Sequence, residues 1–388
     1  MVRWPWILGC VLLAVFIIVY VALVWSNWNC FRGEDSLGAA IRNVVLVVAS
    51  VIALLLAMWR SIIADRQAAA AQAQLALAER ESLDARYQKG ADMLGSGSVS
   101  TRIGGVYALK RLAENRPERF HLQVMELLCA FVRNPPEPKH PHRPLGEDIT
   151  GALDFIIYRS ADAIAIEEST RCTTPRAGPF TDFRDEEGFR VNLKGAILEG
   201  ANLRSAKLRE ANLDNVKMVL VFGRDADFSG AQILTCNLTR SSFHGAIFDR
   251  ATMNDVNMTN TSFQISSFMG AYMKVDLSES DLSGANLTKA YLGSANLKHT
   301  SMNDADLSGA RLERAPRRPL STETGEGARY HGFCRVTQHQ LDSAMANPDD
   351  PPHIEEGTID IETGKPIVWN HKLCGDRWLE HQKTQGSM

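Results

Sequence analysis

The chain has 388 residues, enough for two or three structural units at about 150 residues per domain. Its 42 Lys and Arg residues nearly balance 45 Asp and Glu residues, and the formal net charge of -3 gives no overall field for binding nucleic acid. The length excludes a minimal disulfide-stapled scaffold, and seven Cys residues, an odd number, indicate no disulfide framework.

Two long apolar segments open the chain. Residues 6–25 contain no charged side chain, and residues 39–59 contain one, Arg42, near the end of the segment. A helix of about 20 apolar residues crosses the hydrocarbon layer of a membrane. A signal peptide is the alternative for the first segment, but the segment is too long and a second span follows it. The sequence therefore predicts a transmembrane hairpin in residues 1–60 that contacts the lipid bilayer through residues 6–59.

The positive charges predict how this hairpin is oriented. Arg3 precedes the first segment and Arg60 and Arg66 follow the second, whereas acidic residues offset the single Arg of the loop between them. Both termini are therefore expected in the cytoplasm, with the hairpin in a bacterial-type inner membrane. Cys30 then faces the oxidising side, which leaves a disulfide to another chain open.

Residues 61–133 are predicted to form a cytoplasmic helical stalk and a pair of helices. The stalk is rich in Ala, Gln and Glu and lacks Pro, so it should continue the second span as one helix. Its Ala-rich face has no regular leucine heptad, and homo-oligomer formation through that face is left open. Apolar residues at helical spacing predict helices over 99–115 and 119–133, which together resemble a single HEAT-like repeat.

Two details of this helical pair are interpreted structurally. Gly104 and Gly105 lower helix propensity unless they permit close helix packing, which is the interpretation preferred here. His121 is interpreted as a surface or interface residue and not as a metal ligand. Residues 134–182 follow as a Pro-rich linker with one short helix over 147–158, after which the chain is expected to be irregular until about residue 183.

A period of five residues dominates residues 183–315. Leu, Phe or Met occupies the centre of nearly every pentapeptide, and a small residue stands two positions earlier. Gly223 is the one centre that is not apolar, which predicts a gap or a loop. The step from Met273 to Leu277 is one residue short, which predicts a kink or bulge. Because five is a multiple of neither the helical nor the strand period, the pattern predicts a solenoid in which each pentapeptide forms one side of a square coil.

These repeats, written out in GANLRSAKLREANL and GADLSGARL, resemble the pentapeptide-repeat family. The resemblance implies a right-handed quadrilateral β-helix. The segments preceding the repeats are similar to the helical preface of membrane-anchored members, and residues 336–344 resemble the family's terminal capping helix, within a cap and tail over 316–388. The expected fold is an α+β membrane protein with two N-terminal transmembrane helices, a helical stalk, a small helical unit and the capped solenoid.

The resemblance also bears on function. Some soluble family members resemble DNA in shape and charge and bind gyrase, which requires a strongly acidic rod. Here acidic and basic residues nearly cancel within the repeats, so this interpretation is disfavoured, and no nucleic acid partner is predicted.

No catalytic, cofactor-binding or metal site is assigned. Two H-x-x-C pairs, His331 with Cys334 and His371 with Cys374, have the donor set of a Cys2His2 zinc site but an unusual spacing, so whether they bind zinc is left open. The common phosphate-binding and hydrolase motifs are absent from the sequence.

The predicted function is therefore a non-enzymatic, membrane-anchored scaffold that binds an unidentified protein partner on the faces of its β-helix. The alternative is an oligomeric membrane effector that changes permeability in response to a partner. A third interpretation, a zinc-dependent enzyme, predicts loss of activity on His371→Ala.

Overall fold

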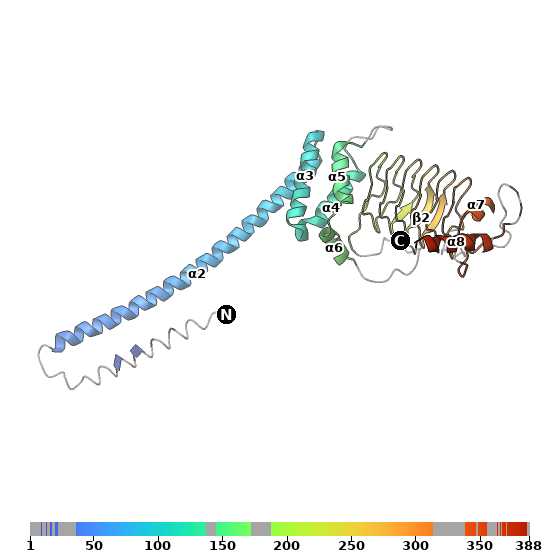
Figure 1. Cartoon of the computed structure of the whole chain (residues 1–388). Coiled ribbons are helices and arrows are strands. Elements are labelled where there is room, and N and C mark those ends of the chain that lie inside the picture. The colour runs from blue at the N-terminus through green and yellow to red at the C-terminus, as the bar shows by residue number, and fades with distance from the viewer. Residues whose placement is uncertain are drawn as a thin grey trace, which may run out of the picture. The chain divides into compact units, whose positions relative to one another are not determined.

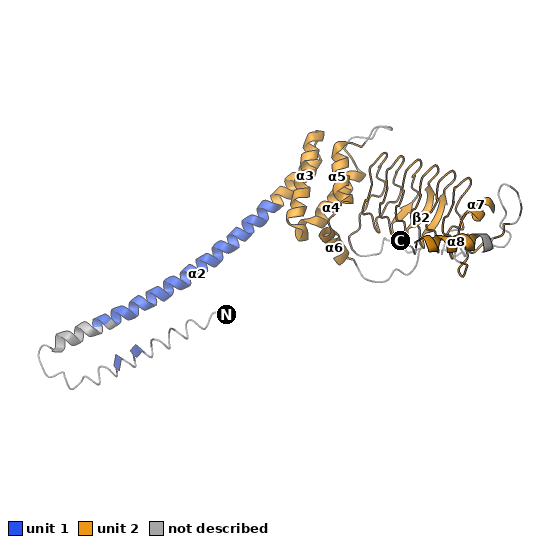
Figure 2. Ribbon diagram, in the orientation of Figure 1, with its two compact units in different colours: residues 1–83 blue, residues 84–388 orange. Residues whose placement is uncertain are grey.

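The computed structural model describes residues 36–136, 145–171, 188–312, 338–346, 348–354 and 371–385, with residues 9, 13, 16, 17, 20, 21, 363, 365 and 367–369. Figure 1 shows the order of its elements, from a long helix through short helices and a stack of coils to two further helices. The chain divides into two compact units, residues 1–83 and residues 84–388 (Figure 2). The finer boundaries expected at residues 60, 133, 182 and 315 stay predictions.

Helix α2 (Ser36–Leu94) supplies most of the described part of unit 1 and ends in unit 2. Within it, Val48–Leu94 contains the one segment of the described chain that is apolar and long enough to cross a membrane, and that segment is not buried. Leu54 and Trp59 are 60% and 65% exposed, which is unfavourable in water but suits hydrocarbon. This segment agrees with the second predicted span, and α2 continues without a break through the predicted stalk. The first predicted span, residues 6–25, lies almost entirely outside the described residues.

Four shorter helices follow in unit 2: α3 (Val99–Asn115), α4 (Pro117–Arg133), α5 (Glu147–Ile157) and α6 (Ala161–Ser169). The first three pack against one another around fully buried side chains such as Leu109, Val124 and Ile156. They lie close to the predicted positions. Helix α6 was not predicted, because it has nine residues, no continuous apolar stripe and one fully buried acid, Glu167.

The paired glycines of α3 explain how closely it approaches the end of α2. A Cβ atom on Gly105 would lie 2.9 Å from the carbonyl oxygen of Gly90 and 2.9 Å from Cβ of Met93. A Cβ atom on Gly104 would lie 2.8 Å from the methyl carbon of Met93. The preferred interpretation of these glycines, close helix packing, is confirmed.

Residues 188–312 form a solenoid whose successive coils pair in parallel. Four ladders of bridges connect the coils: ladder 1 begins with Asn192 and Asn212, and ladder 2 with Ile197 and Lys217. Ladder 3 begins with Asn202 and ladder 4 with Lys207. The partners are 20 residues apart, or 19 where the shortened step after Met273 lies between them. This spacing defines coil 1 (192–211), coil 2 (212–231), coil 3 (232–251), coil 4 (252–271), coil 5 (272–290) and coil 6 (291–310).

Each side of a coil is only about five residues long, so few sides form a regular strand. Only β1 (Gln232–Leu234), β2 (Thr252–Asn257) and β3 (Tyr272–Asp276) reach strand length, and they pair in the order β1-β2-β3. The register shifts between Asn254 and Val256, so that Asp255 is an extra residue opposite β3. This irregularity is the bulge predicted from the shortened step after Met273.

A repeated turn explains why the chain changes direction every five residues. Ala196 N donates to the carbonyl oxygen of the centre residue Leu193 (2.9 Å), and Gly195 between them has a φ of 74°. This is the pattern of a type II turn, which needs a left-handed residue at its third position. The equivalent residue of most other turns also has a positive φ, and 15 of these residues are not glycine.

The centre residues form a continuous apolar core. Phe228, Phe248 and Phe268 stack at centroid distances of 4.9 and 5.0 Å, and Phe243 stacks on Phe263 at 5.5 Å. The gap or loop predicted at Gly223 was wrong, because the ring of Phe243 occupies this space. A Cβ atom on Gly223 would lie only 2.3 Å from Cδ1 of that ring.

The short helices cover the first coil. Lys207 N donates to the carbonyl oxygen of Ile157 at the end of α5 (3.0 Å), and Arg133 of α4 donates to the carbonyl oxygen of Asn192 (2.8 Å). The backbone edge at the start of the solenoid is therefore partly paired with the helices.

The chain after the solenoid covers the last coil. In α7 (Gln338–Ser343), Gln340 donates to the carbonyl oxygens of Leu297 and Thr300 at 2.6 and 2.8 Å. Met345 and His353 then extend ladders 4 and 1. Helix α7 is the predicted terminal helix, whereas α8 (His371–Gln385), which packs against it, was not predicted.

Candidate interaction surfaces of the solenoid

The four residues of the hypothesised zinc site lie mostly outside the described structure. His331 and Cys334 fall within 313–337, and the side chain of His371 is also outside it. Cys374 is buried with its Sγ 3.5 Å from the carbonyl oxygen of Leu341, and burial raises its pKa to about 11. Within the described chain, no group of three or more His, Cys, Asp and Glu residues could hold a metal ion. Zinc binding stays a prediction.

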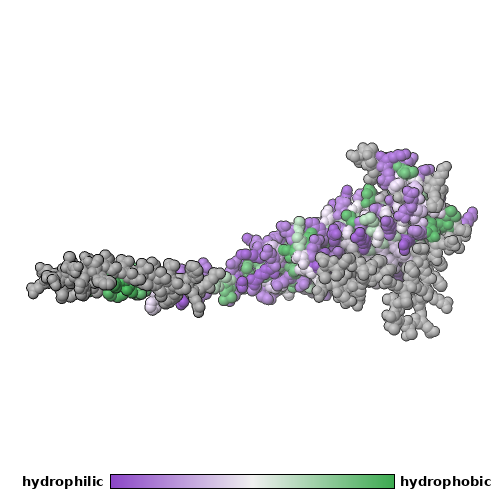
Figure 3. Space-filling model, turned by 90° about the horizontal axis from the view of Figure 1, so that it is seen from below, coloured by the Kyte–Doolittle hydropathy of each residue, from purple (hydrophilic) through white to green (hydrophobic). Residues whose placement is uncertain are grey.

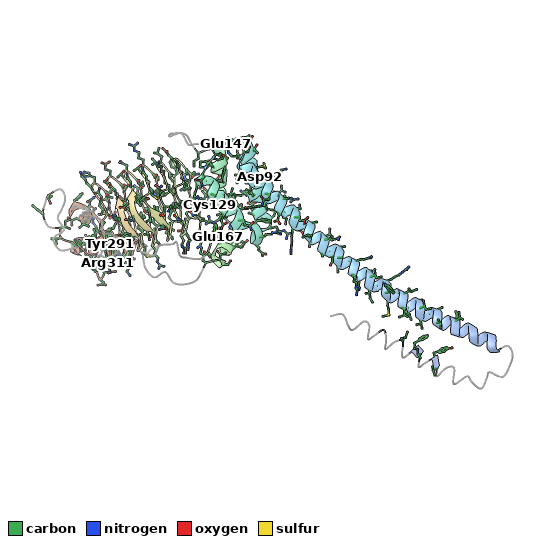
Figure 4. All side chains as sticks on the ribbon, turned by 180° about the vertical axis from the view of Figure 1, so that it is seen from behind. Asp92, Cys129, Glu147, Glu167, Tyr291 and Arg311 are labelled. Carbon is green, nitrogen blue, oxygen red and sulfur yellow. The ribbon has the colours of Figure 1, made fainter. Side chains whose placement is uncertain are left out.

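One cluster of titratable side chains lies inside unit 2, between the helices and coil 1. His121 Nε2 and Arg159 Nε lie 2.8 and 2.9 Å from Glu167 Oε1, and all three side chains are nearly inaccessible. Arg159 Nη2 also donates to the carbonyl oxygen of Lys207 in coil 1 (2.9 Å). Burial lowers the pKa of Arg159 and raises the pKa of Cys129 to about 11; Figure 4 marks Cys129 and Glu167.

This buried cluster joins the helices to the solenoid through the hydrogen bond from Arg159 to Lys207. The Cys129 thiol stays protonated at neutral pH, and the four side chains are at most 6% exposed, so a substrate cannot reach them. His121 was predicted to be a surface or interface residue. It lies at a buried interface, so the interface alternative is confirmed and the surface alternative is wrong. This pairing could not be predicted from the sequence, because 46 positions separate His121 from Glu167.

Ladder 1 carries two tyrosines whose rings stack outside the core. Tyr272 and Tyr291 lie 5.1 Å apart between ring centroids and are half-buried, and Arg311 follows in the same ladder (Figure 4). Burial raises the pKa of Tyr272. These rings contact each other along the solenoid axis and add to its packing.

The face of unit 2 that Figure 3 shows is mostly polar where it is described. In Figure 3 the visible described atoms of unit 2 are largely purple, with separate green patches. On the solenoid, the exposed large apolar side chains are Leu220 (48%), Phe222 (54%), Ile247 (38%), Ile265 (66%) and Met269 (40%).

Three of these apolar residues surround one position of ladder 4. Ile247 of coil 3 pairs with Ser267 of coil 4, and Ile265 and Met269 stand two residues before and after Ser267. Neighbouring coils are about 4.8 Å apart, so all three residues lie next to the position of Ser267. The carboxylate of Asp249 lies there too, because it accepts hydrogen bonds from the Ser267 hydroxyl (2.5 Å) and the Met269 backbone nitrogen (3.0 Å). We call Ile247, Ile265 and Met269 the ladder 4 patch.

Backbone conformation makes two of the exposed apolar residues unusual. Leu220 and Ile265 both have a φ of 57°, in the left-handed region. A β-branched residue such as Ile265 is strained there, whereas Gly, Asn or Asp fits readily. Neither the exposure nor the backbone conformation of Ile265 favours the stability of the solenoid.

The repeat phase alone identifies the positions of these residues as outward-facing. The sequence alone nevertheless did not single out these five apolar side chains. The left-handed conformation of Ile265 depends on the exact turn, which the repeat pattern does not specify for a β-branched residue.

Comparison with known proteins identifies the repeats. Residues 189–221, 226–264, 236–274 and 276–314 match the family described as pentapeptide repeats, in 8 copies. No curated protein sequence matches the chain.

Several solved structures are similar to part of the chain. Full-length QnrB1, a plasmid-mediated fluoroquinolone resistance protein, is 17% identical over 30% of this chain and 72% of its own, with a TM-score of 0.22. HetL, a protein involved in heterocyst differentiation regulation from the cyanobacterium Nostoc, is 24% identical over 32% of this chain and 75% of its own, with a TM-score of 0.20. A pentapeptide repeat protein from the Arabidopsis thaliana thylakoid lumen is 22% identical over 36% of this chain and 79% of its own, with a TM-score of 0.15.

Proposed function

Since its repeats make this chain a member of the pentapeptide-repeat family, we propose that it is a non-enzymatic, membrane-anchored scaffold whose solenoid binds a protein partner. The observation that carries this proposal is the ladder 4 patch, formed by Ile247, Ile265 and Met269. The solenoid already has a closed apolar core and contacts at both ends, so its folding does not need these exposed side chains.

Membrane attachment is the second part of the proposal. The apolar, unburied segment of α2 supports one membrane-spanning helix. We extend this to a two-span hairpin in a bacterial inner membrane with both termini in the cytoplasm. The right-handed, four-sided form of the solenoid belongs to the same proposal.

Site-specific photocrosslinking tests the binding surface. A photoreactive amino acid replaces Ile265 in the full-length chain, and a matched variant carries it at Thr235. Thr235 is also exposed and also has a positive φ, 51°, but lies at a different corner of the solenoid. We expect a discrete adduct with a different protein, and not with a second copy of this chain, from position 265 in cells and none from position 235.

Substitution of the neighbouring patch residues completes the test. Ile247→Ser with Met269→Ser should remove the adduct formed at position 265, because the partner then loses most of its apolar contact. Equal adducts at positions 235 and 265, or none, would contradict the scaffold proposal. Dye leakage from cells on expression, without an adduct, would favour the alternative membrane effector.

A further inference from the structure

The third side of the solenoid shows an ordered distribution of charge. We define face 3 as the side of the solenoid that contains the ladder 3 residues and the outward residues two positions after them. It also includes the corner residues at the two ends of that side. Its basic residues lie in coils 1 to 3, where Arg204, Arg224 and Arg240 are exposed. The only acidic residue of face 3 in these coils is Asp225, 3.4 Å from Arg224.

The other half of face 3 has the opposite charge. Coils 5 and 6 carry Glu279, Asp281 and Asp304, and each half also contains one histidine, His244 in coil 3 and His299 in coil 6. Coil 4, between the two halves, contributes no charged residue to this face.

The acidic half is held in place by contacts along the surface. Ser283 donates to Asp281 Oδ1 from its backbone nitrogen (2.9 Å) and its hydroxyl (2.5 Å), and Gln264 donates to Asp281 Oδ2 (2.5 Å). Burial alone raises the pKa of Asp281, but these hydrogen bonds outweigh it and lower the pKa. Asn260 also donates to Glu279 (3.0 Å). Asp281 therefore stays ionised at neutral pH.

The basic half has little compensation of this kind. Among the described residues, Arg204 and Arg240 form no ion pair, and the single pair of Arg224 is with an aspartate that is 58% exposed. Leu220 and Phe222 lie among these arginines and are about half exposed. The basic half thus combines arginines that form no ion pair among the described residues with exposed apolar surface.

We propose that face 3 binds face 3 of a second copy of this chain, with the two solenoids antiparallel. In this arrangement coils 1 and 2 of one copy lie against coils 5 and 6 of the other, so that Arg224 meets Asp281. A two-fold interface is self-complementary, and each such contact occurs twice. The small side chains of Ser242 and Ser262 in coils 3 and 4 lie near the two-fold axis, where they allow close approach.

The dimensions of face 3 indicate a weak interface. Five residues at about 3.3 Å by six coils at about 4.8 Å give roughly 500 Å² per copy. The total of about 1,000 Å² is near the lower limit for a specific interface, so the dimer should be weak and sensitive to salt. Anchoring in one membrane, if the proposed function holds, raises the effective concentration of the copies.

Cysteine crosslinking of the full-length protein in detergent tests the dimer. Ser242→Cys places a thiol near the expected two-fold axis, and a short bismaleimide reagent should yield crosslinked dimers. The chain without this substitution measures the background from its seven native Cys residues, of which the three described ones, Cys129, Cys236 and Cys374, are buried. Lys217→Glu, an exposed charge reversal in ladder 2, is the matched control and should leave the yield unchanged.

Charge reversal on face 3 supplies the decisive comparison. In the Ser242→Cys background, Arg224→Glu or Asp281→Arg alone should lower the yield at least tenfold, because each places like charges opposite one another. The double variant should restore the yield to within about threefold, because the opposite charges are exchanged and both ends of the interface change together.

Three results would overturn the inference. One is no crosslink above background, and another is a crosslink unaffected by either reversal. The third is failure of the double variant to recover its crosslinking yield although its unfolding midpoint matches that of the parent chain.

A dimer formed through α2 alone is distinguished by the same variants. It would persist in mass measurements of the Arg224→Glu variant but would not show the loss and recovery of crosslinking. Ile265 is a corner residue of face 3 as well as a member of the ladder 4 patch. The test changes none of the patch residues and uses the protein in detergent without a partner, so its outcome does not depend on the proposed protein partner.

Discussion

At Gly223 the core of the solenoid accepts a phenylalanine ring from the next coil. Gly223→Ala should lower the free energy of unfolding by about 1–3 kcal/mol, because the added methyl group overlaps the ring of Phe243. Chemical denaturation of the full-length protein in detergent measures this change. Gly97→Ala is the control, since a Cβ atom there meets nothing within 4 Å.

The same contact predicts a compensating change. Phe243→Leu, combined with Gly223→Ala, removes the overlapping ring atoms and restores the residue type found at most other centres. The double variant should recover at least about 1 kcal/mol relative to the sum of the single effects. Strict additivity would mean that the two residues do not compete for this space.

Ile265 predicts a conflict between stability and binding. Ile265→Asn should raise the free energy of unfolding by about 1 kcal/mol, because Asn tolerates a left-handed backbone and the 66% exposed isoleucine loses little burial. Thermal unfolding measures the gain. Ile247→Asn in the same patch should give none, because Ile247 does not have a positive φ. A loss of stability in Ile265→Asn would show that this isoleucine packs favourably.

Among the elements, α6 depends on a polar contact more than on apolar burial. Glu167→Gln should destabilise unit 2 by about 3 kcal/mol, because it leaves the buried charge of Arg159 without its counter-charge. Glu168→Gln is the matched control: Glu168 is the next residue in α6 but is exposed, so an effect below about 0.5 kcal/mol is expected.

Amide exchange locates the effect of Glu167→Gln. Arg159 and the backbone of Lys207 connect α5 and α6 to coil 1, and the Lys207 amide donates to Ile157 (3.0 Å). That amide should exchange faster in Glu167→Gln, whereas exchange in coil 4 should change less. Equal acceleration throughout the solenoid would indicate that helices and coils unfold as one cooperative unit.

The elements at the end of the solenoid protect its last coil. Deleting residues 338–388 removes Gln340, Met345 and His353, and should cause concentration-dependent self-association through the uncovered edge. Deleting only residues 371–388 keeps these three contacts and is the control. Light scattering in detergent distinguishes them, and equal scattering would assign the protection to other residues.

The sequence predicted elements that have a regular pattern and missed those that depend on single contacts. The phase of the five-residue repeat placed the coils and the bulge after Met273, because each centre must face the core. Helices α6 and α8 lack a regular apolar stripe, and α6 is held partly by the buried Glu167. The repeat phase also marks Ile247 and Met269 as outward-facing, but their grouping with Ile265 needs the pairing of Ile247 with Ser267.

For the whole molecule, the two units differ in where their apolar residues lie. Unit 2 buries its apolar residues in the helical core and the solenoid, whereas the apolar segment of α2 is exposed in unit 1. Such a segment inserts favourably into a bilayer, with about 0.3–0.6 kcal/mol from each central Leu, Ile or Val. The anchor is therefore expected to lie before the polar part of α2.

A chain that begins at residue 60 should accordingly remain in the supernatant after membranes are sedimented. The full-length chain should stay in the pellet after a carbonate wash and be released only by detergent, and so should a control lacking residues 371–388. If the shortened chain still sediments, unit 2 itself contacts lipid or a membrane-bound partner. Ile247→Ser with Met269→Ser then separates these explanations, because loss of the ladder 4 patch should release the shortened chain only if the partner binds there.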